Sequence, residues 1–278
     1  MSEKLLEVQD LRVTFPTHRG DIDVVKGISF DLGRERLAIV GESGSGKSMT
    51  GRSILRLIRS PGRVTATKLK FDNIDLLDQS EKQMRALRGA RISMVMQDPK
   101  YSLNPVLTIG EQIGEALRTH QNLPRKQVHD RVIDMLDQVR INDPDRVAKL
   151  YPHEVSGGMG QRIMIAMMLI PEPDLLIADE PTSALDVSVQ AQVLDLIDGL
   201  IQQKGMGLII ISHDLNLVAN YADRVLVMNA GEIVEECDAS ALKDAQHPYT
   251  KGLLAAVPRI DETREELPTL DRSQWDAT

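Results

Sequence analysis

Alternating hydrophobic and polar residues mark the first part of the chain. The alternation is clear in residues 11–15 and again in 24–30, which predicts strands with one buried face. Residues 37–40 form an uninterrupted apolar run, typical of a fully buried strand, and residues 53–57 suit a helix. We therefore predict that the region up to about residue 90 is rich in strands.

Helical spacing replaces this alternation between about residues 100 and 165. Thr108 and Glu111 form a capping-box pattern, which predicts the first turn of a helix. Beyond it, apolar residues recur on one predicted helical face, at Val128, Val132, Met135, Leu136 and Val139.

From about residue 172, apolar runs alternate with helical segments. Such alternation predicts strands of a parallel sheet, here at 175–178 and 208–211. Residues 225–228 and 233–234, separated by Asn229-Ala230-Gly231, predict a closing hairpin. The segment 259–278 is charged and poorly periodic, so we expect a loosely ordered tail.

A glycine-rich segment separates the buried strand at 37–40 from the helix that follows. It fits the phosphate-loop pattern, in which glycines and a helix N-terminus let backbone N–H groups surround phosphates. The lysine of the pattern can reach the β- and γ-phosphates of a nucleotide, and the hydroxyl after it can bind Mg²⁺. A chance match in a glycine-rich loop is the alternative. The segment consists of Gly41, Glu42, Ser43, Gly44, Ser45, Gly46, Lys47 and Ser48, and Met49 follows it.

The composition excludes several other classes of protein. The 278 residues are 42% hydrophobic, which is ample for a core, and no apolar run approaches the roughly 20 residues of a membrane span. The net charge of −8 and the 3% aromatic content argue against a nucleic-acid-binding surface, so we expect no nucleic-acid partner. A single cysteine, Cys237, excludes an internal disulfide and an iron–sulfur cluster held by cysteines of this chain. Residues 1–4 lack the plan of a signal peptide, so we expect a cytoplasmic protein.

A second small-residue segment precedes the apolar helical run at 163–170. Ser156, Gly157, Gly158 and Met159 offer another helix N-terminus suited to an anion, although Ser156 can equally be an ordinary N-cap. Together with the phosphate loop, this segment resembles the signature sequence of the ATP-binding cassette (ABC) ATPases.

The remaining motifs follow in the order that this family shows. Asp179, at the end of an apolar strand, resembles the Walker B aspartate that holds Mg²⁺. Glu180 resembles the general base that polarises the attacking water. Gln97 resembles the Q-loop glutamine, which touches the metal and that water. His213 resembles the switch histidine at the γ-phosphate, although a lone histidine after a strand is usually structural.

Two further assignments have strong structural alternatives. Ser183, Ala184, Leu185 and Asp186 resemble the D-loop of the family, but Asp186 can also cap the helix that follows. Phe15 resembles the aromatic residue that stacks on adenine, but its place in an alternating strand explains it equally well as core.

The resemblance covers residues 5 to about 258 and implies the fold. We expect an α/β P-loop NTPase with a parallel-sheet core, an antiparallel β subdomain and a helical insertion at about 100–165. The predicted domains are a nucleotide-binding domain at 1–258 and a tail at 259–278. ATP and Mg²⁺ are the implied ligands.

Three segments indicate one branch of the family: 102–112, 151–154 and 247–250. They resemble the ATPase subunits of peptide, opine and nickel importers. Such a subunit is expected to pair with a second ATPase, and a heterodimer is favoured over a homodimer. It is also expected to bind two permease subunits and to depend indirectly on a solute-binding protein. It would lie at the cytoplasmic face of the inner membrane. The sequence departs from this branch at Gly160, where relatives commonly carry Arg, and lacks their cysteine-rich tail.

Two alternatives stay open from the sequence. One is a soluble ABC ATPase with a non-transport role, for which two cassettes or a long linker would be expected. The other is a binding module with a degenerate site, against which the joint presence of Lys47, Asp179, Glu180 and His213 argues.

Overall fold

The computed structural model describes residues 4–96, 102–183, 185–215 and 219–256, which form two compact units. The first unit comprises residues 1–77 and 210–278, and the second comprises residues 78–209. Strand β9 (Gly207–Ser212) crosses from the second unit to the first. The predicted boundaries at 1–258 and 259–278 stay a prediction, because residues 257–278 lie outside the described part.

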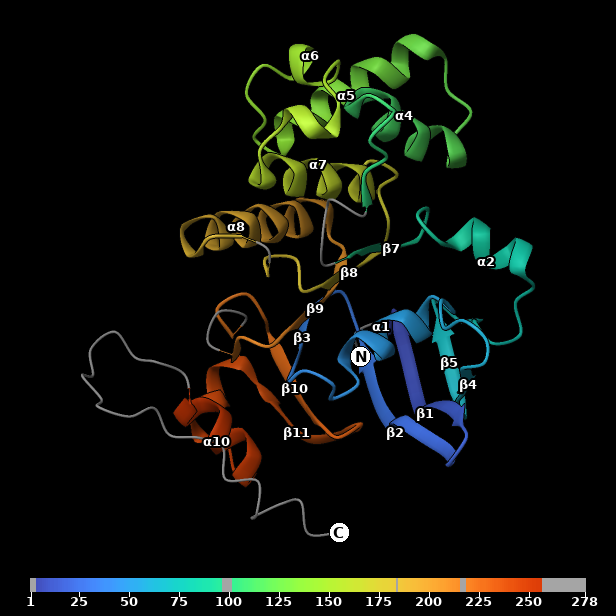
Figure 1. Cartoon of the computed structure of the whole chain (residues 1–278), viewed down its shortest axis with the longest axis vertical. Helices are drawn as coiled ribbons and strands as arrows, with labels where there is room; N and C mark the ends of the chain where they lie inside the picture. The colour runs from blue at the N-terminus through green and yellow to red at the C-terminus, as the bar shows by residue number, and fades with distance from the viewer. Residues whose placement is uncertain (1–3, 97–101, 184, 216–218, 257–278) are drawn as a thin grey trace. The chain divides into compact units, whose positions relative to one another are not determined.

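An antiparallel sheet forms one part of the first unit (Figure 1). Two pairs of residues on β1 face the core, Leu6 with Val8 and Leu11 with Val13. The register with β2 shifts between the two pairs, where Asp10 has a φ of 48°. Such a bulge lets both pairs bury the same face of the strand. The sheet follows the order β2-β1-β5-β6, with β4 also paired to β1, and its strands are β1 (Leu6–Thr17), β2 (Gly20–Leu32), β4 (Arg63–Thr65), β5 (Lys68–Phe71) and β6 (Ile74–Asp75).

The other part of the first unit carries the phosphate loop. Strand β3 (Arg36–Val40) runs parallel to β10 (Arg224–Asn229), which returns antiparallel as β11 (Glu232–Asp238). The predicted hairpin is present, and its turn has positive φ angles at Ala230 (46°) and Gly231 (89°). Helix α1 (Lys47–Ile54) follows the loop, and the chain continues beyond β11 through η2 (Ala239–Asp244) into α10 (Pro248–Ala256).

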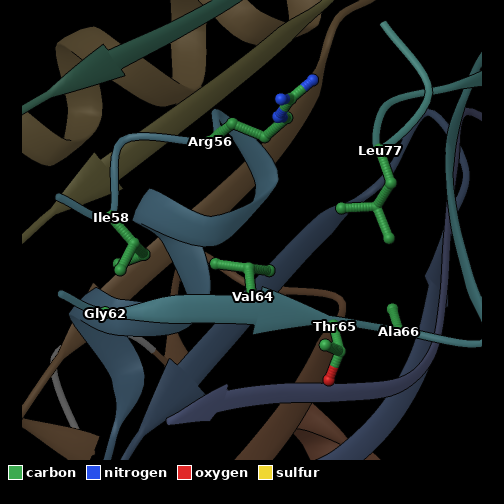
Figure 2. Close-up of a pocket in the computed structure, with 7 residues that line it drawn as sticks. All are labelled: Arg56, Ile58, Gly62, Val64, Thr65, Ala66 and Leu77. Atoms are coloured by element: carbon green, nitrogen blue, oxygen red, sulfur yellow. The ribbon is translucent and has the colours of Figure 1, made fainter. Parts of the chain in front are cut away.

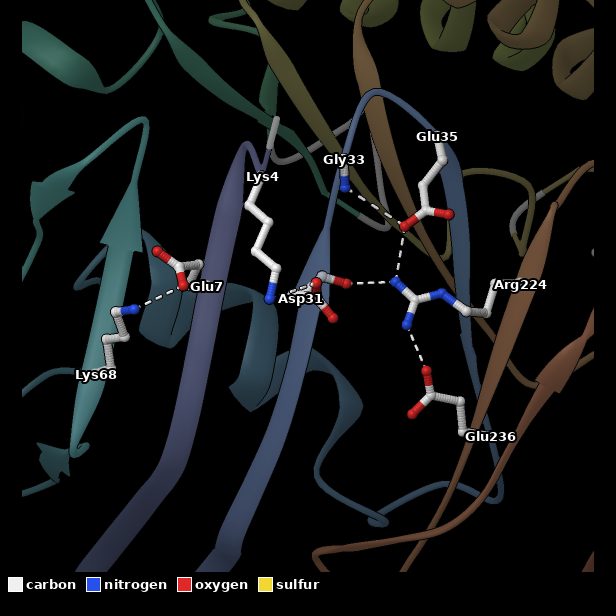
Figure 3. Close-up of polar contacts among 8 residues, drawn as sticks. All are labelled: Lys4, Glu7, Asp31, Gly33, Glu35, Lys68, Arg224 and Glu236. Atoms are coloured by element: carbon white, nitrogen blue, oxygen red, sulfur yellow. Dashed lines mark hydrogen bonds and ion pairs between the residues drawn. The ribbon is translucent and has the colours of Figure 1, made fainter. Parts of the chain in front are cut away.

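A charged network links strands of the first unit (Figure 3). The guanidinium of Arg224 donates to Glu35 Oε1 at 2.7 Å, and also to Glu236 and to the carbonyl oxygen of Asp31. Its side chain is only 18% exposed, so these partners replace much of its hydration. At the edge of this network, Lys4 pairs with Asp31 at 3.0 Å.

The second unit contains the predicted helical region. The capping box at α4 is confirmed, because Thr108 Oγ1 accepts from Glu111 N and Thr108 N donates to Glu111 Oε2. Helix α4 packs on α5 and α7, and the predicted apolar face of α5 is buried. The helices of this unit are α2 (Glu81–Leu87), α4 (Ile109–His120), α5 (Arg125–Gln138), α6 (Pro144–Val147), η1 (Pro152–Glu154), α7 (Gly157–Leu169) and α8 (Val187–Lys204).

Two strands of the second unit pair in parallel. They are β7 (Ile92–Val95) and β8 (Leu175–Asp179), with Ile92 opposite Leu175 and Val95 opposite Ala178. All residues of both strands are buried, as expected for a parallel sheet. The predicted parallel-sheet core is therefore confirmed by the β7–β8 and β3–β10 pairs, although β7 was not among the predicted strands. Within the described residues, no helix is both long and apolar enough to span a bilayer.

Candidate nucleotide-binding and catalytic site

The phosphate loop joins the C-terminal end of β3 to the first turn of α1. Two of its glycines occupy backbone positions that no side chain could share. A Cβ on Gly41 would lie 2.1 Å from the carbonyl oxygen of Met228, and one on Gly46 would lie 2.7 Å from that of Val24. Gly46 also has a φ of 101°, which favours glycine. Close packing against β10 and β2 therefore requires glycine in the loop.

Lys47 is the first residue of α1, and its side chain folds back over the loop. Its ammonium Nζ donates to the carbonyl oxygens of Gly41 and Glu42, each at 2.8 Å, and to Ser45 Oγ at 3.4 Å. Lys47 is only 5% exposed. Ser48 follows it in the first turn and is half-buried. The loop thus holds a buried cation beside a hydroxyl at a helix N-terminus, which is the chemistry that phosphate binding needs.

Other predicted residues of the first unit lie outside this loop. His213 directly follows β9 and is exposed, and the next backbone N–H, of Asp214, donates to Ser212 Oγ at 3.0 Å. Phe15 is half-buried on β1, opposite Ile22. A Cβ on Gly62 would lie 2.7 Å from the Phe15 ring, so the ring packs closely against that glycine.

The first unit also has an open pocket of about 460 Å³, shown in Figure 2. It lies beside the end of α1 and β4, and none of the predicted site residues that the structure describes lines it. Its lining consists of Arg56, Ile58, Gly62, Val64, Thr65, Ala66 and Leu77.

The two predicted acids stand at the end of β8 in the second unit. Asp179 is the last residue of that strand and is 3% exposed, whereas Glu180 is half-buried. Glu180 has a φ of 48°, in the left-handed region that non-glycine residues seldom occupy. Backbone strain of this kind concentrates at functional sites, so the conformation is consistent with a role for Glu180.

The signature segment begins helix α7 of the same unit. Ser156 is the N-cap and accepts from Met159 N at 3.3 Å, so the capping interpretation holds. Ser156 and Gly157 are nevertheless exposed and remain accessible to a ligand. The helix continues through Gly160, whose N–H donates to the carbonyl oxygen of Ser156 at 2.8 Å. The glycine at this position therefore does not interrupt α7.

The remaining predicted residues are only partly described. Asp186 takes the N-cap position of α8, as predicted, but its side chain makes no capping hydrogen bond. Ser183 Oγ donates to the carbonyl oxygen of Glu180 at 3.2 Å, which connects the D-loop-like segment to the predicted base. Gln97 and Ala184 lie outside the described residues. In the part of the chain that the structure describes, no three His, Cys, Asp or Glu residues cluster as a metal site.

Two contacts at these motifs were not predicted from the sequence. Tyr249 Oη on α10 accepts from the N–H of Glu42 in the phosphate loop, and Gln161 Nε2 on α7 donates to the carbonyl oxygen of Pro181, next to Glu180. Tyr249 belongs to the His-Pro-Tyr-Thr segment at 247–250, but nothing in that segment indicates its partner.

Comparisons with known proteins identify the relatives of this chain. A family model described as "ABC transporter" matches residues 25–183, and one described as "Oligopeptide/dipeptide transporter, C-terminal region" matches residues 234–278. The dipeptide transport ATP-binding protein DppD of Bacillus subtilis (strain 168) is 50% identical, over 97% of this chain and 81% of the relative. The oligopeptide transport ATP-binding protein OppD of the same organism is 46% identical, over 95% of this chain and 74% of the relative.

Solved structures resemble the chain in the same way. The dimeric ATP-binding cassette MJ0796 bound to ADP and Pi has a TM-score of 0.74 and 26% identity, over 84% of this chain and 98% of its own. The cbiO1 protein of Clostridium perfringens has a TM-score of 0.73 and 28% identity, over 87% and 92% of the two chains. The chain therefore belongs to the ABC transporter family, and it is an ATP-binding cassette ATPase.

Proposed function

We propose that the chain is the ATP-hydrolysing subunit of a peptide importer. The observation that carries this proposal is the match of residues 234–278 to the C-terminal region of oligopeptide and dipeptide transporters. The high identity to DppD and OppD, over nearly the whole chain, supports the same assignment. Opines or nickel are the alternative cargoes.

In this proposal the phosphate loop binds ATP. The Lys47 ammonium, now held by loop carbonyls, would neutralise charge on the β- and γ-phosphates. Mg²⁺ prefers oxygen ligands, and the resemblance to the family assigns this role to Ser48, Asp179 and Gln97. Ser48 would bind the ion directly, Asp179 through water, and Gln97 would complete the set. Bound Mg²⁺ would offset charge on the phosphate oxygens.

Hydrolysis is assigned to residues beyond the loop. Glu180 would accept a proton from the attacking water as the general base. Gln97 would orient that water, and His213 would stabilise charge on the transferred phosphoryl group. Phe15 would stack on adenine. These roles rest on the order of the motifs along the chain.

A second cassette would complete the site. The signature residues Ser156, Gly157, Gly158 and Met159 would contact the γ-phosphate bound by the partner. The exposure of Ser156 and Gly157 supports this, as does the dimeric form of MJ0796. A heterodimer of two ATPases is favoured, with a homodimer as the alternative.

The permease is proposed to dock on the second unit. An open pocket of about 380 Å³ lies there, lined by α4, by α7 and by the segment before α4, and it includes Leu107, Met167 and Met168. Apolar and polar side chains mix in this lining, which suits a cytoplasmic helix of a permease. The ATPase would then lie at the cytoplasmic face of the membrane.

The test is peptide uptake by a reconstituted complex. The chain is co-expressed with candidate permease, binding-protein and second ATPase genes of the same genome, and the complex is placed in liposomes. We expect ATP-dependent uptake of a labelled dipeptide or oligopeptide, with Glu180→Gln as the inactive control. Uptake of nickel but not of peptide would contradict the assignment of peptide as the cargo. Failure of the chain to co-purify with any permease would favour a soluble ABC ATPase.

A further inference from the structure

The side chain of Tyr249 connects the C-terminal part of the chain to the phosphate loop. Tyr249 lies in the first turn of α10 and is 0% exposed. Its hydroxyl oxygen accepts a hydrogen bond from the backbone N–H of Glu42 at 2.9 Å, across 207 positions of sequence. Both residues belong to the first unit.

The same peptide group also holds the lysine of the site. The N–H of Glu42 and the carbonyl of Gly41 belong to one planar peptide unit. The carbonyl oxygen accepts from Lys47 Nζ at 2.8 Å, while the N–H donates to Tyr249 Oη. A rotation of this peptide would therefore disturb the contacts of Tyr249 and Lys47 together.

Tyr249 is itself anchored by the residues before α10. Its backbone N–H donates to His247 Nδ1 at 3.2 Å, which satisfies a free donor of the first helical turn. The N–H groups of Gln246 and His247 donate to Glu235 Oε1 on β11, at 2.6 and 3.3 Å. The tyrosine is thus held between β11 and the phosphate loop.

We propose that Tyr249 is a positioning residue for ATP. Its hydroxyl holds the Gly41–Glu42 peptide in the orientation that places the Lys47 ammonium over the loop. Because Tyr249 and not the nucleotide makes this hydrogen bond to the loop, the loop would need less ordering on binding, and affinity would rise. Tyr249 lies within the segment that matches the C-terminal region of oligopeptide and dipeptide transporters, so a residue of that segment contributes to nucleotide binding.

The test is Tyr249→Phe in the full chain, which removes the hydroxyl and keeps the ring. A neutral hydrogen bond corresponds to roughly a 2- to 10-fold change in an equilibrium constant. We therefore expect the Kd for ATP, measured by calorimetry well below the Tm, to rise about 2- to 10-fold. The KM for ATP should rise similarly, with kcat at saturating ATP little changed. Tyr221→Phe removes a tyrosine hydroxyl elsewhere in the same unit and is the matched control.

Hydrogen exchange at the Glu42 amide separates positioning from general stability. In the nucleotide-free wild type this amide should exchange slowly, and Tyr249→Phe should accelerate its exchange selectively. Rapid exchange in the wild type would overturn the proposal. So would a Tyr249→Phe variant with a lower Tm but unchanged Kd and KM for ATP. The Kd and hydrogen exchange are measured on the isolated chain, and KM and kcat are measured with the partner cassette present. None of these measurements needs permease or peptide, so they are independent of the proposed cargo.

Discussion

Gln161 donates a hydrogen bond from its side-chain Nε2 to the carbonyl oxygen of Pro181. Gln161 lies on α7, five positions after the signature serine, and Pro181 directly follows Glu180. Gln161 is 0% exposed, so neither group can exchange this partner for water without a rearrangement. Within the second unit, the signature helix is thus tied to the loop that carries the predicted base.

Replacing Gln161 by Met keeps the side-chain volume and removes the donor. The carbonyl of Pro181 would lose this partner, whereas the change also removes Gln161 Oε1, which is buried and has no hydrogen-bond partner among the described residues. The net loss in the free energy of unfolding should therefore be about 1 kcal/mol, the low end for an unsatisfied buried group. Urea denaturation measures this loss. We also expect kcat to fall more than ATP affinity, because Glu180 adjoins the released carbonyl. Equal stability and kcat in the variant and the wild type would show that the hydrogen bond is dispensable.

Lys47→Ala should weaken ATP binding itself. A hydrogen bond from a charged group is worth about 1.5–3 kcal/mol, so the Kd for ATP should rise at least roughly tenfold. Calorimetry with ATP and ADP measures the effect. Lys82→Ala, at an exposed position of α2, is the control for loss of a lysine. An unchanged ATP affinity would remove Lys47 from the site.

Glu180→Gln should preserve ATP binding and lower the rate of hydrolysis by about 10²–10⁴, the usual contribution of a general base. Steady-state phosphate release and nucleotide affinity are measured on the same preparation. Glu172→Gln is the control, because Glu172 is an exposed carboxylate paired with Lys204. If Glu180→Gln retained wild-type turnover, another group would be the base.

Ser156→Arg tests the composite site. Ser156 is exposed at the start of α7, so a larger side chain has room there. The variant should lose about 1 kcal/mol of stability with the N-cap but keep this chain's own ATP binding. Hydrolysis at the partner's nucleotide should fall when the variant is mixed with a partner that has a normal phosphate loop. Turnover is followed against protein concentration. Activity independent of concentration, in a protein shown to be monomeric, would defeat the two-cassette mechanism.

The pair formed by Arg36 and Asp223 predicts a pH dependence of stability. Hydrogen bonds from the Arg36 side chain hold the pKa of Asp223 below its usual value, against the opposing effect of burial. A carboxyl whose pKa is lowered in the folded state stabilises the fold above its unfolded pKa, and this is lost as pH falls through the folded pKa. The Asp223 side chain is 44% exposed, so the contribution should not exceed about 1 kcal/mol.

Asp223→Asn checks this dependence. Its free energy of unfolding should lie below that of the wild type near neutral pH, and the difference should shrink below about pH 4, where aspartate becomes protonated. Arg36→Met should likewise lower the free energy of unfolding near neutral pH, and its difference from the wild type should also shrink below about pH 4. A difference that stays constant from pH 7 to pH 3 would contradict the electrostatic origin.

Local patterns were enough to predict most elements of the fold. The capping box at Thr108 and Glu111 and the hairpin turn at Ala230 and Gly231 depend on residues within a few positions of one another. The apolar runs of β3, β8 and β9 predicted buried strands, because a strand covered on both faces is built from nearly continuous apolar residues. Asp186 shows the limit of such reasoning, since its position at the N-cap does not secure a capping hydrogen bond.

The sequence by itself determined the phosphate loop, because its glycines, lysine and serine act through the backbone of one short segment. It also determined the family, since the other motifs follow in a recognisable order. Only the tertiary structure decided which distant groups meet: Tyr249 with Glu42, Gln161 with Pro181, and Arg224 with Glu35. The physical reason is that a buried polar side chain bonds whichever group the packing places within reach. The spacing of residues along the sequence does not predict which distant group that will be.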